Sequence, residues 1–120
     1  MKKILIVDDE EAIIKMYATA LSGYNVIPAK TGVEALELAK SENPDLIYLD
    51  IIMPRLNGLD VLRRLKNDGL TKDIPVVLLT NLPEEASADK AKSLGAVGYF
   101  VKAEYEPEKV AEETKKLIGS

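Results

Sequence analysis

The feature that most constrains the fold is a set of short apolar runs, each of which stops abruptly at a polar side chain. The runs and the residues that end them are 4–7 before Asp8 and Asp9, 46–49 before Asp50, 74–79 before Thr80, and 98–101 before Lys102. Continuous apolar runs of this length are typical of strands that are buried on both faces, as in a parallel sheet. The pattern therefore predicts a parallel sheet whose strands end in polar groups.

Segments with helical periodicity separate the runs. The first helix is predicted to carry the negative charges of Glu10 and Glu11 in its first turn. Its predicted inward residues are Ile13, Tyr17, Ala20 and Leu21. Thr31 and Glu34 have the spacing of a capping box and predict the start of the second helix. The remaining helices are predicted at about 59–67, from Pro83 to about Leu94, and from Pro107, with Val110, Thr114, Leu117 and Ile118 on the inward face of the last one.

A fifth strand is predicted at 25–29, where Pro28 cannot donate a backbone hydrogen bond. Such a strand belongs at the edge of a sheet. Alternating strands and helices imply parallel pairing with right-handed crossovers and helices on both faces. The predicted fold is α/β: one doubly wound, five-stranded parallel sheet of order 2-1-3-4-5 with five helices. Its switch point falls between the first and third strands.

The composition limits the chemistry. The 120 residues fit one domain, and 47% hydrophobic with 30% charged residues is typical of a globular protein. The chain has no histidine and no cysteine, which leaves carboxylates, hydroxyls, lysine and a hard metal ion. The net charge of -4 argues against direct nucleic-acid binding. The apolar run after Lys2 and Lys3 is too short for export or for a membrane span, so we expect a cytoplasmic protein.

The polar residues that end the strands should meet at one edge of the sheet. Asp8, Asp9 and Asp50 would bring three carboxylates together, and such a group favours a hard cation such as Mg²⁺. Thr80 and Lys102 would face it from the other strands. A phosphoryl group would satisfy the cation, the ammonium and the hydroxyl together. Asp50 is ionised at neutral pH and needs no base to attack phosphorus, and aspartyl phosphates are an established class of intermediate.

This constellation resembles the receiver domain of two-component response regulators, over essentially the whole chain, 1–120. The resemblance rests on Asp8, Asp9, Asp50, Met53, Pro54, Gly58, Thr80, Tyr99 and Lys102. It implies a flavodoxin-like fold, and since the chemotaxis members of the family have the 2-1-3-4-5 order, the predicted topology is not independent of it. The resemblance implies a phosphorylation-controlled switch rather than an enzyme.

The resemblance also implies roles for individual residues. Asp50 would be the phosphoacceptor, and Mg²⁺ would be bound by Asp9, Asp50 and the main-chain carbonyl of Ile52, with Asp8 helping through water. Lys102 would pair with the phosphoryl group. The implied partners are a sensor histidine kinase or phosphotransfer protein and a downstream protein target. The chain would be a monomer or a phosphorylation-dependent dimer.

Two residues would then report phosphorylation. Thr80 would move toward the phosphoryl group and Tyr99 would turn inward. The surface that rearranges would be formed by the fourth helix, the fifth strand and the fifth helix. The fourth helix has mostly alanine on its predicted inward side, Ala88 and Ala91 with Leu94, and so should be weakly anchored.

The sequence departs from the family pattern at four positions. Ala103 follows the lysine, where the family usually has a proline after a cis peptide bond, so the loop must be strained or take another path. Asn81 stands where the family usually has a small residue and is expected to hinder Tyr99. Ile52 and Leu82 are apolar where fast-hydrolysing members often carry polar groups. We therefore expect a slowly hydrolysing phosphoaspartate.

Three other functions fit parts of the pattern. A phosphatase of the haloacid dehalogenase type needs an aspartate two positions after its nucleophile, but Ile52 stands there. A nucleotide- or flavin-binding domain would be expected to carry a phosphate-binding loop after the first strand, where the chain has acidic residues instead. A receiver-like scaffold that is never phosphorylated is opposed by the acidic pair, Thr80 and Lys102. Taken singly, each of these residues is also compatible with a purely structural role, as a helix cap or a surface charge.

Overall fold

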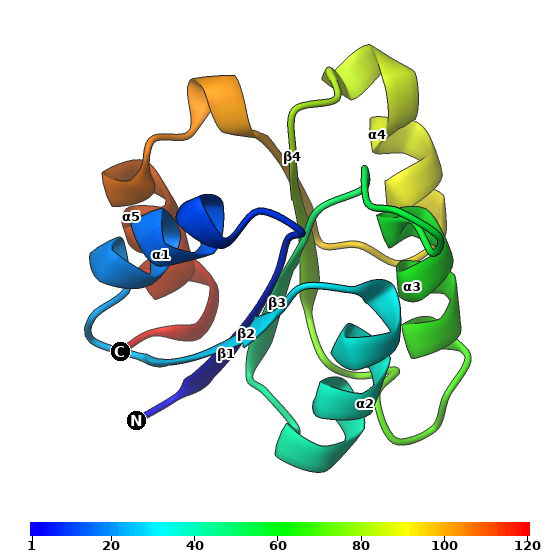
Figure 1. The fold of residues 1–120 in the computed structure, drawn as a ribbon, viewed down its shortest axis with the longest axis horizontal. Coiled ribbons are helices and arrows are strands. Elements are labelled where there is room, and N and C mark those ends of the chain that lie inside the picture. The colour runs from blue at the N-terminus through cyan, green and yellow to red at the C-terminus, as the bar shows by residue number, and fades with distance from the viewer.

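The computed structural model describes residues 1–120 and contains a five-stranded parallel sheet. The strands are β1 (Lys3–Val7), β2 (Asn25–Ala29), β3 (Leu46–Leu49), β4 (Val76–Thr80) and β5 (Gly98–Val101). The helices are α1 (Glu11–Ala20), α2 (Gly32–Glu42), α3 (Gly58–Lys66), α4 (Glu84–Ser93) and α5 (Pro107–Ile118), with a 3₁₀ turn η1 (Lys102–Glu104) after β5. The strand order is β2-β1-β3-β4-β5, which confirms the predicted fold and topology (Figure 1).

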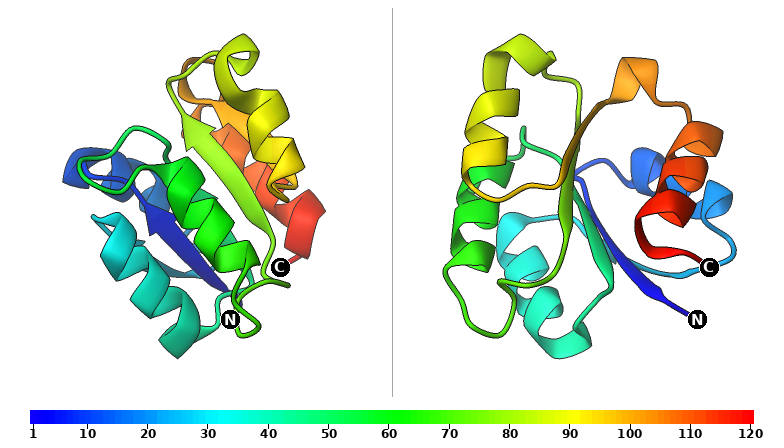
Figure 2. Two further views of the ribbon diagram at one scale, coloured as in Figure 1. Left: turned by 90° about the vertical axis from the view of Figure 1, so that its right-hand side faces the viewer. Right: turned by 180° about the vertical axis from the view of Figure 1, so that it is seen from behind.

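The sheet separates two hydrophobic cores. Helices α1 and α5 cover one face, and α2, α3 and α4 cover the other (Figures 1 and 2). Successive strand residues alternate between them: Ile4 and Ile6 belong to the core under α1 and α5, whereas Leu5 and Val7 belong to the core under α2, α3 and α4. Because both faces are covered, the strands are apolar throughout. No helix has the length and apolar character needed to cross a membrane.

The edge position predicted for β2 is confirmed. This strand pairs in parallel with β1 alone, with Pro28 opposite Ile6. An edge strand has no second neighbour that would need the missing amide of Pro28. Strand β1 pairs on its other side with the central strand β3, with Val7 opposite Leu49, and this register aligns the residues that follow the two strands.

Local capping explains where two helices begin. Thr31 Oγ1 accepts a hydrogen bond from the Glu34 amide at 3.0 Å, which confirms the predicted start of α2. Helix α3 has an equivalent cap, because Asn57 Oδ1 accepts from the Asp60 amide at 3.1 Å. Side-chain caps of this kind satisfy amides that have no partner within the helix. Pro83 was predicted to be the first residue of the fourth helix, but it is the N-terminal cap residue that precedes α4.

Two predicted helix faces need correction. Leu117 is 41% exposed, and the inward face of α5 is formed by the buried Val110 and Thr114, with Ile118 partly buried against the same core. In α4 the buried residues are Ser87 and Ala91, while Ala88 is half-buried. Burial of Ser87 was not predicted, because its hydroxyl forms a hydrogen bond with Tyr99 of β5. Helical periodicity does not reveal a contact with another element.

Candidate functional site

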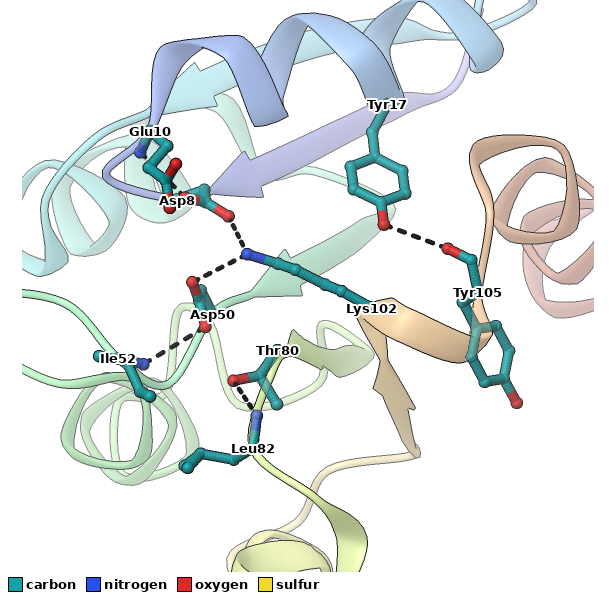
Figure 3. Close-up of polar contacts among 9 residues, drawn as sticks. All are labelled: Asp8, Glu10, Tyr17, Asp50, Ile52, Thr80, Leu82, Lys102 and Tyr105. Atoms are coloured by element: carbon teal, nitrogen blue, oxygen red, sulfur yellow. Dashed lines mark hydrogen bonds and ion pairs between the residues drawn. The ribbon is translucent and has the colours of Figure 1, made fainter.

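The carboxyl ends of β1, β3, β4 and β5 bring the predicted polar residues to one rim (Figure 3). Asp8 and Asp50 directly follow Val7 and Leu49, which are paired in the sheet, and the Asp50 amide donates to the Val7 carbonyl at 3.0 Å. The two carboxylates are therefore neighbours by register. This position beside the switch point between β1 and β3 is where ligands bind in doubly wound sheets.

Lys102 joins these two carboxylates. Its Nζ lies 2.6 Å from Asp8 Oδ2 and 3.1 Å from Asp50 Oδ2, and the lysine side chain is only 8% exposed (Figure 3). Burial lowers the pKa of Lys102, but the hydrogen bond to Asp8 and the charges of Asp50 and Asp8 outweigh it, so that the pKa is raised above its ordinary value. Lys102 is therefore a cation at neutral pH and connects the ends of three strands.

The backbone around Asp50 is tightly fixed. The Ile52 amide donates to Asp50 Oδ1 at 3.3 Å, and the Gly58 amide donates to the Ile51 carbonyl at 2.8 Å. A Cβ atom at Gly58 would lie 2.0 Å from the Asp50 carbonyl oxygen, which is far inside any real contact. Gly58 is therefore needed for the close approach of α3 to the Asp50 backbone.

Acidic side chains crowd the rim next to Asp50. Carboxylate oxygens of Asp8, Asp9 and Glu10 lie within 4.8 Å of one another. A pocket of about 160 Å³ is lined by Asp9, Glu10, Asp50, Ile52 and Asn81. With Asp50, four carboxylates face one ammonium, that of Lys102. Oxygen donors with this excess of negative charge suit a hard divalent cation such as Mg²⁺.

Glu10 is the residue of this rim that the sequence analysis missed. It was interpreted only as a charge near the start of the first helix, whereas the structure places it in both the acidic cluster and the pocket. The Glu10 amide donates to Asp8 Oδ1 at 2.9 Å, so this turn also orients Asp8. The available signal was the run of four acidic residues from Asp8 to Glu11.

Thr80 is the last residue of β4 and is fully buried. Its Oγ1 accepts a hydrogen bond from the Leu82 amide at 3.3 Å (Figure 3). The hydroxyl is therefore engaged by its own loop rather than by Asp50 or Lys102. Of the two apolar positions noted in the sequence, Ile52 is 57% exposed beside the pocket and Leu82 is half-buried.

Tyr99 lies half-buried against α4. Its hydroxyl donates to the Leu82 carbonyl at 3.0 Å and lies 2.6 Å from Ser87 Oγ. Since the tyrosine proton goes to Leu82, Ser87 is the donor of the second bond. Asn81 is exposed at the pocket, so it does not occupy the space that Tyr99 takes in this structure.

The segment after Lys102 forms a 3₁₀ turn at the position where Ala103 departs from the family pattern. The chain contains no cis peptide bond, and Lys102–Glu104 form the η1 turn, which is closed by the Tyr105 amide donating to the Lys102 carbonyl at 3.3 Å. Tyr17 of α1 donates its hydroxyl to the Tyr105 carbonyl at 3.1 Å (Figure 3). Burial raises the pKa of the Tyr17 hydroxyl, while the nearby charge of Lys102 lowers it and that of Asp8 raises it. Neither tyrosine was singled out as a site residue from the sequence.

Comparison with known proteins is consistent with this geometry. Residues 4–114 match the sequence model of the "Response regulator receiver domain". The chain is 40% identical over 119 residues to the alkaline phosphatase synthesis transcriptional regulatory protein PhoP of Bacillus subtilis, which covers 98% of this chain and 48% of PhoP. It is 35% identical over 103 residues to the polar-differentiation response regulator DivK of Brucella ovis, covering 84% of each. The chain thus spans about half the length of several curated relatives.

Solved structures agree in the fold. The chemotaxis protein CheY4 of Vibrio cholerae superposes with a TM-score of 0.89 at 30% sequence identity, over 98% of both chains. The receiver domain of the Francisella response regulator 1452 superposes with a TM-score of 0.88 at 26% identity.

Proposed function

Because the chain belongs to the response regulator receiver family, whose domains are phosphorylated on an aspartate in two-component signalling, we propose that Asp50 is its phosphoacceptor. One observation carries this choice. Asp50 lines the pocket and contacts Lys102, whereas Asp8 is held by both Lys102 and the Glu10 amide and does not line the pocket. Asp50 is thus the carboxylate that has both an entry path and a cation in contact.

Phosphoryl transfer to Asp50 requires mainly that the reacting groups be correctly placed. A receiver domain is a phosphorylation-controlled switch and takes its phosphoryl group from a histidine kinase. In this chain an oxygen of Asp50 would attack phosphorus as the bond to the donor's imidazole nitrogen breaks. A carboxylate nucleophile has no proton to lose as it attacks, so no base is needed. Lys102, in contact with Asp50, would neutralise the charge that the phosphoryl oxygens bring.

The proposed cofactor is Mg²⁺. Asp9, Asp50 and the main-chain carbonyl of Ile52 would hold it, Asp8 would act through water, and Glu10 lies close enough to add charge. When bound, the ion would supply positive charge to phosphoryl oxygens that Lys102 alone cannot neutralise. The excess of carboxylates over ammonium groups supports this assignment.

Thr80 and Tyr99 are proposed to transmit the change. Thr80 Oγ1 accepts a long hydrogen bond, 3.3 Å, from the Leu82 amide. Replacing this bond with a hydrogen bond from the Thr80 hydroxyl to a phosphoryl oxygen would therefore cost little free energy. Leu82 also accepts from Tyr99, so movement of the 80–82 loop would disturb the contact between Tyr99 and α4. The proposed output surface is that of α4, β5 and α5.

The proposed domain is one receiver unit over 1–120, and its partners follow from its chemistry. We propose a sensor histidine kinase or a phosphotransfer protein as donor and a protein as downstream target, with the domain a monomer or a phosphorylation-dependent dimer. The net charge of -4 opposes direct DNA binding by these residues. PhoP is named a transcriptional regulatory protein, but the chain matches only 48% of its length.

The apolar groups beside the site support slow hydrolysis. Ile52 is exposed at the pocket, and Leu82 lies on the loop after Thr80. Because both side chains are apolar, neither can form a hydrogen bond that orients a water molecule toward the phosphoryl group. We expect Ile52→Asn to shorten the lifetime of the phosphorylated form, as followed by the decay of its intact mass. A wild-type lifetime of seconds would contradict slow hydrolysis.

The assignment of Asp50 is tested by intact-mass measurement after incubation with acetyl phosphate and Mg²⁺. We expect one added phosphoryl group in the wild type and in Asp9→Asn at a reduced rate, and none in Asp50→Asn. Chelation of Mg²⁺ should abolish the adduct. An adduct that persists in Asp50→Asn would show that another residue is the acceptor. No adduct in the wild type, with beryllofluoride also leaving the protein unchanged, would favour the scaffold alternative.

A further inference from the structure

Strand β5 holds the start of the turn that carries Lys102, and beyond that strand the turn is held at Tyr105. Ala103 and Glu104 are exposed, and neither side chain makes a hydrogen bond or an ion pair with another element. Tyr105 closes the turn through its amide, which donates to the Lys102 carbonyl. The path of the chain after Lys102 therefore depends on what holds Tyr105.

Three contacts hold Tyr105, two at its ring and one at its carbonyl. Its ring stacks on Phe100 of β5, with centroids 4.2 Å apart and planes at 4°, and Lys109 Nζ lies 4.3 Å from the ring centre. Its carbonyl accepts the Tyr17 hydroxyl at 3.1 Å. Tyr17 is 1% exposed and comes from α1, which begins at Glu11, just after the turn that carries Asp8. The hydroxyl therefore ties the turn to a helix that is otherwise remote in sequence.

We propose that Tyr17 is a positioning residue for phosphoryl transfer: its hydroxyl fixes the η1 turn through the Tyr105 carbonyl and so holds Lys102 Nζ between Asp8 and Asp50. This inference rests on the proposed function of Asp50 and Lys102. Ala103 leaves the turn without the restriction that a proline would impose on the backbone. The Tyr17 bond supplies a restriction from outside the turn.

The Tyr17→Phe variant tests the proposal because it keeps the buried ring and removes only the hydroxyl. Tyr24→Phe is a matched control, since Tyr24 also donates its hydroxyl to a backbone carbonyl, that of Gly119 at 2.6 Å, far from the site. We expect Tyr17→Phe to lower the rate of phosphorylation by acetyl phosphate about fivefold or more, because misplaced groups lose effectiveness steeply. Tyr24→Phe should change the rate less than about twofold.

A double-mutant cycle that combines Tyr17→Phe with Lys102→Ala distinguishes a positioning role of Tyr17 from a merely structural one. The quantity measured is the phosphorylation rate at high acetyl phosphate concentration or the affinity for beryllofluoride. If Tyr17 acts through Lys102, Tyr17→Phe should have no further effect once the lysine is gone. Amide hydrogen exchange at Tyr105 should speed up in Tyr17→Phe and not in Tyr24→Phe. An equal loss with and without Lys102 would overturn the proposal, as would unchanged phosphorylation in Tyr17→Phe.

The outcomes distinguish this proposal from the function on which it rests. A wild type that is not phosphorylated on Asp50 contradicts the proposed function. A wild type that is phosphorylated, with Tyr17→Phe behaving as Tyr24→Phe, contradicts only the positioning role. Should Tyr17→Phe fail to fold, Tyr105→Leu removes the stacking on Phe100 from the same turn. We expect it to slow phosphorylation, again only when Lys102 is present.

Discussion

Helices α3 and α4 lie on the same side of the sheet, yet they are anchored very differently (Figure 2). In α3, Val61, Leu62 and Leu65 are buried at 1% exposure or less, and Gly58 presses against the Asp50 backbone. In α4 only Ser87 and Ala91 are buried. Since hydrophobic stabilisation follows the apolar area removed from water, α3 is held by far more free energy than α4.

The difference fits the two proposed roles of these helices. Helix α3 begins where the Asp50 loop closes, so its anchoring fixes the phosphoacceptor. Helix α4 borders an open pocket of about 300 Å³ between itself and β5, lined in part by Ala88, Ala91, Ala96 and Tyr99. A helix that buries so few side chains costs little to move, as an element that changes position must. The fold therefore places a rigid acceptor beside a helix that can shift.

The largest effect is expected from breaking the α3 contact with Asp50. Gly58→Ala would place a Cβ atom 2.0 Å from the Asp50 carbonyl oxygen, so the backbone must move. We expect a loss of about 4 kcal/mol in the free energy of unfolding, at the upper end for single substitutions. Phosphorylation of any folded fraction should also fall. Urea unfolding followed by circular dichroism measures the loss.

Gly69→Ala is the control for this substitution, because nothing lies within 4 Å of the Cβ that it would add. We expect a change within about 0.5 kcal/mol. Equal losses in the two variants would show that the close packing at Gly58 has no special cost.

The comparison of anchoring is tested directly by shortening one leucine in each helix region. Leu62→Ala in α3 removes a side chain that is 0% exposed and should cost about 3 kcal/mol. Leu94→Ala at the end of α4 removes a half-buried side chain and should cost about 1 kcal/mol. Thermal or urea unfolding measures both. Similar losses would contradict the weaker anchoring of α4.

Much of this arrangement could be predicted from the sequence, for a physical reason. Buried parallel strands are continuous apolar runs, so their ends, and with them Asp8, Asp50, Thr80 and Lys102, are visible in the chain itself. Register then brings these ends together. The weak anchoring of α4 could also be predicted, because the small alanine side chains on its inward face are visible in the sequence.

The contacts that hold the site could not be predicted in the same way. Tyr17 donates to a residue 88 positions away, and Ser87 meets Tyr99 across 12 positions, so neither pair produces a periodic pattern. In the sequence, Glu10 is an ordinary residue for the start of a helix. Only the fold of the turn after β1 places it at the pocket. Such contacts depend on side-chain orientations that arise after the elements have packed.

A smaller effect is expected from cutting the hydrogen bond between α4 and Tyr99. Ser87→Ala removes the 2.6 Å bond to the Tyr99 hydroxyl, while Tyr99 keeps its bond to the Leu82 carbonyl. We expect a loss of about 1 kcal/mol and faster amide exchange in α4. The control is Ser93→Ala, whose exposed hydroxyl bonds only within the same helix. Unchanged exchange in Ser87→Ala would show that this bond does not hold α4.

The smallest effect is expected from making α4 more like α3. Ala88→Leu adds apolar volume at the pocket between α4 and β5 and should stabilise the domain by about 0.5 to 1 kcal/mol, with slower amide exchange in α4. Ala86→Leu adds the same side chain on the exposed side of the helix and should do neither. Because a better-anchored helix must break more contacts to move, phosphorylation should perturb the α4 amides less in Ala88→Leu than in the wild type. NMR chemical shifts with and without beryllofluoride measure this, and an undiminished perturbation would mean that the loose packing of α4 is not what permits its movement.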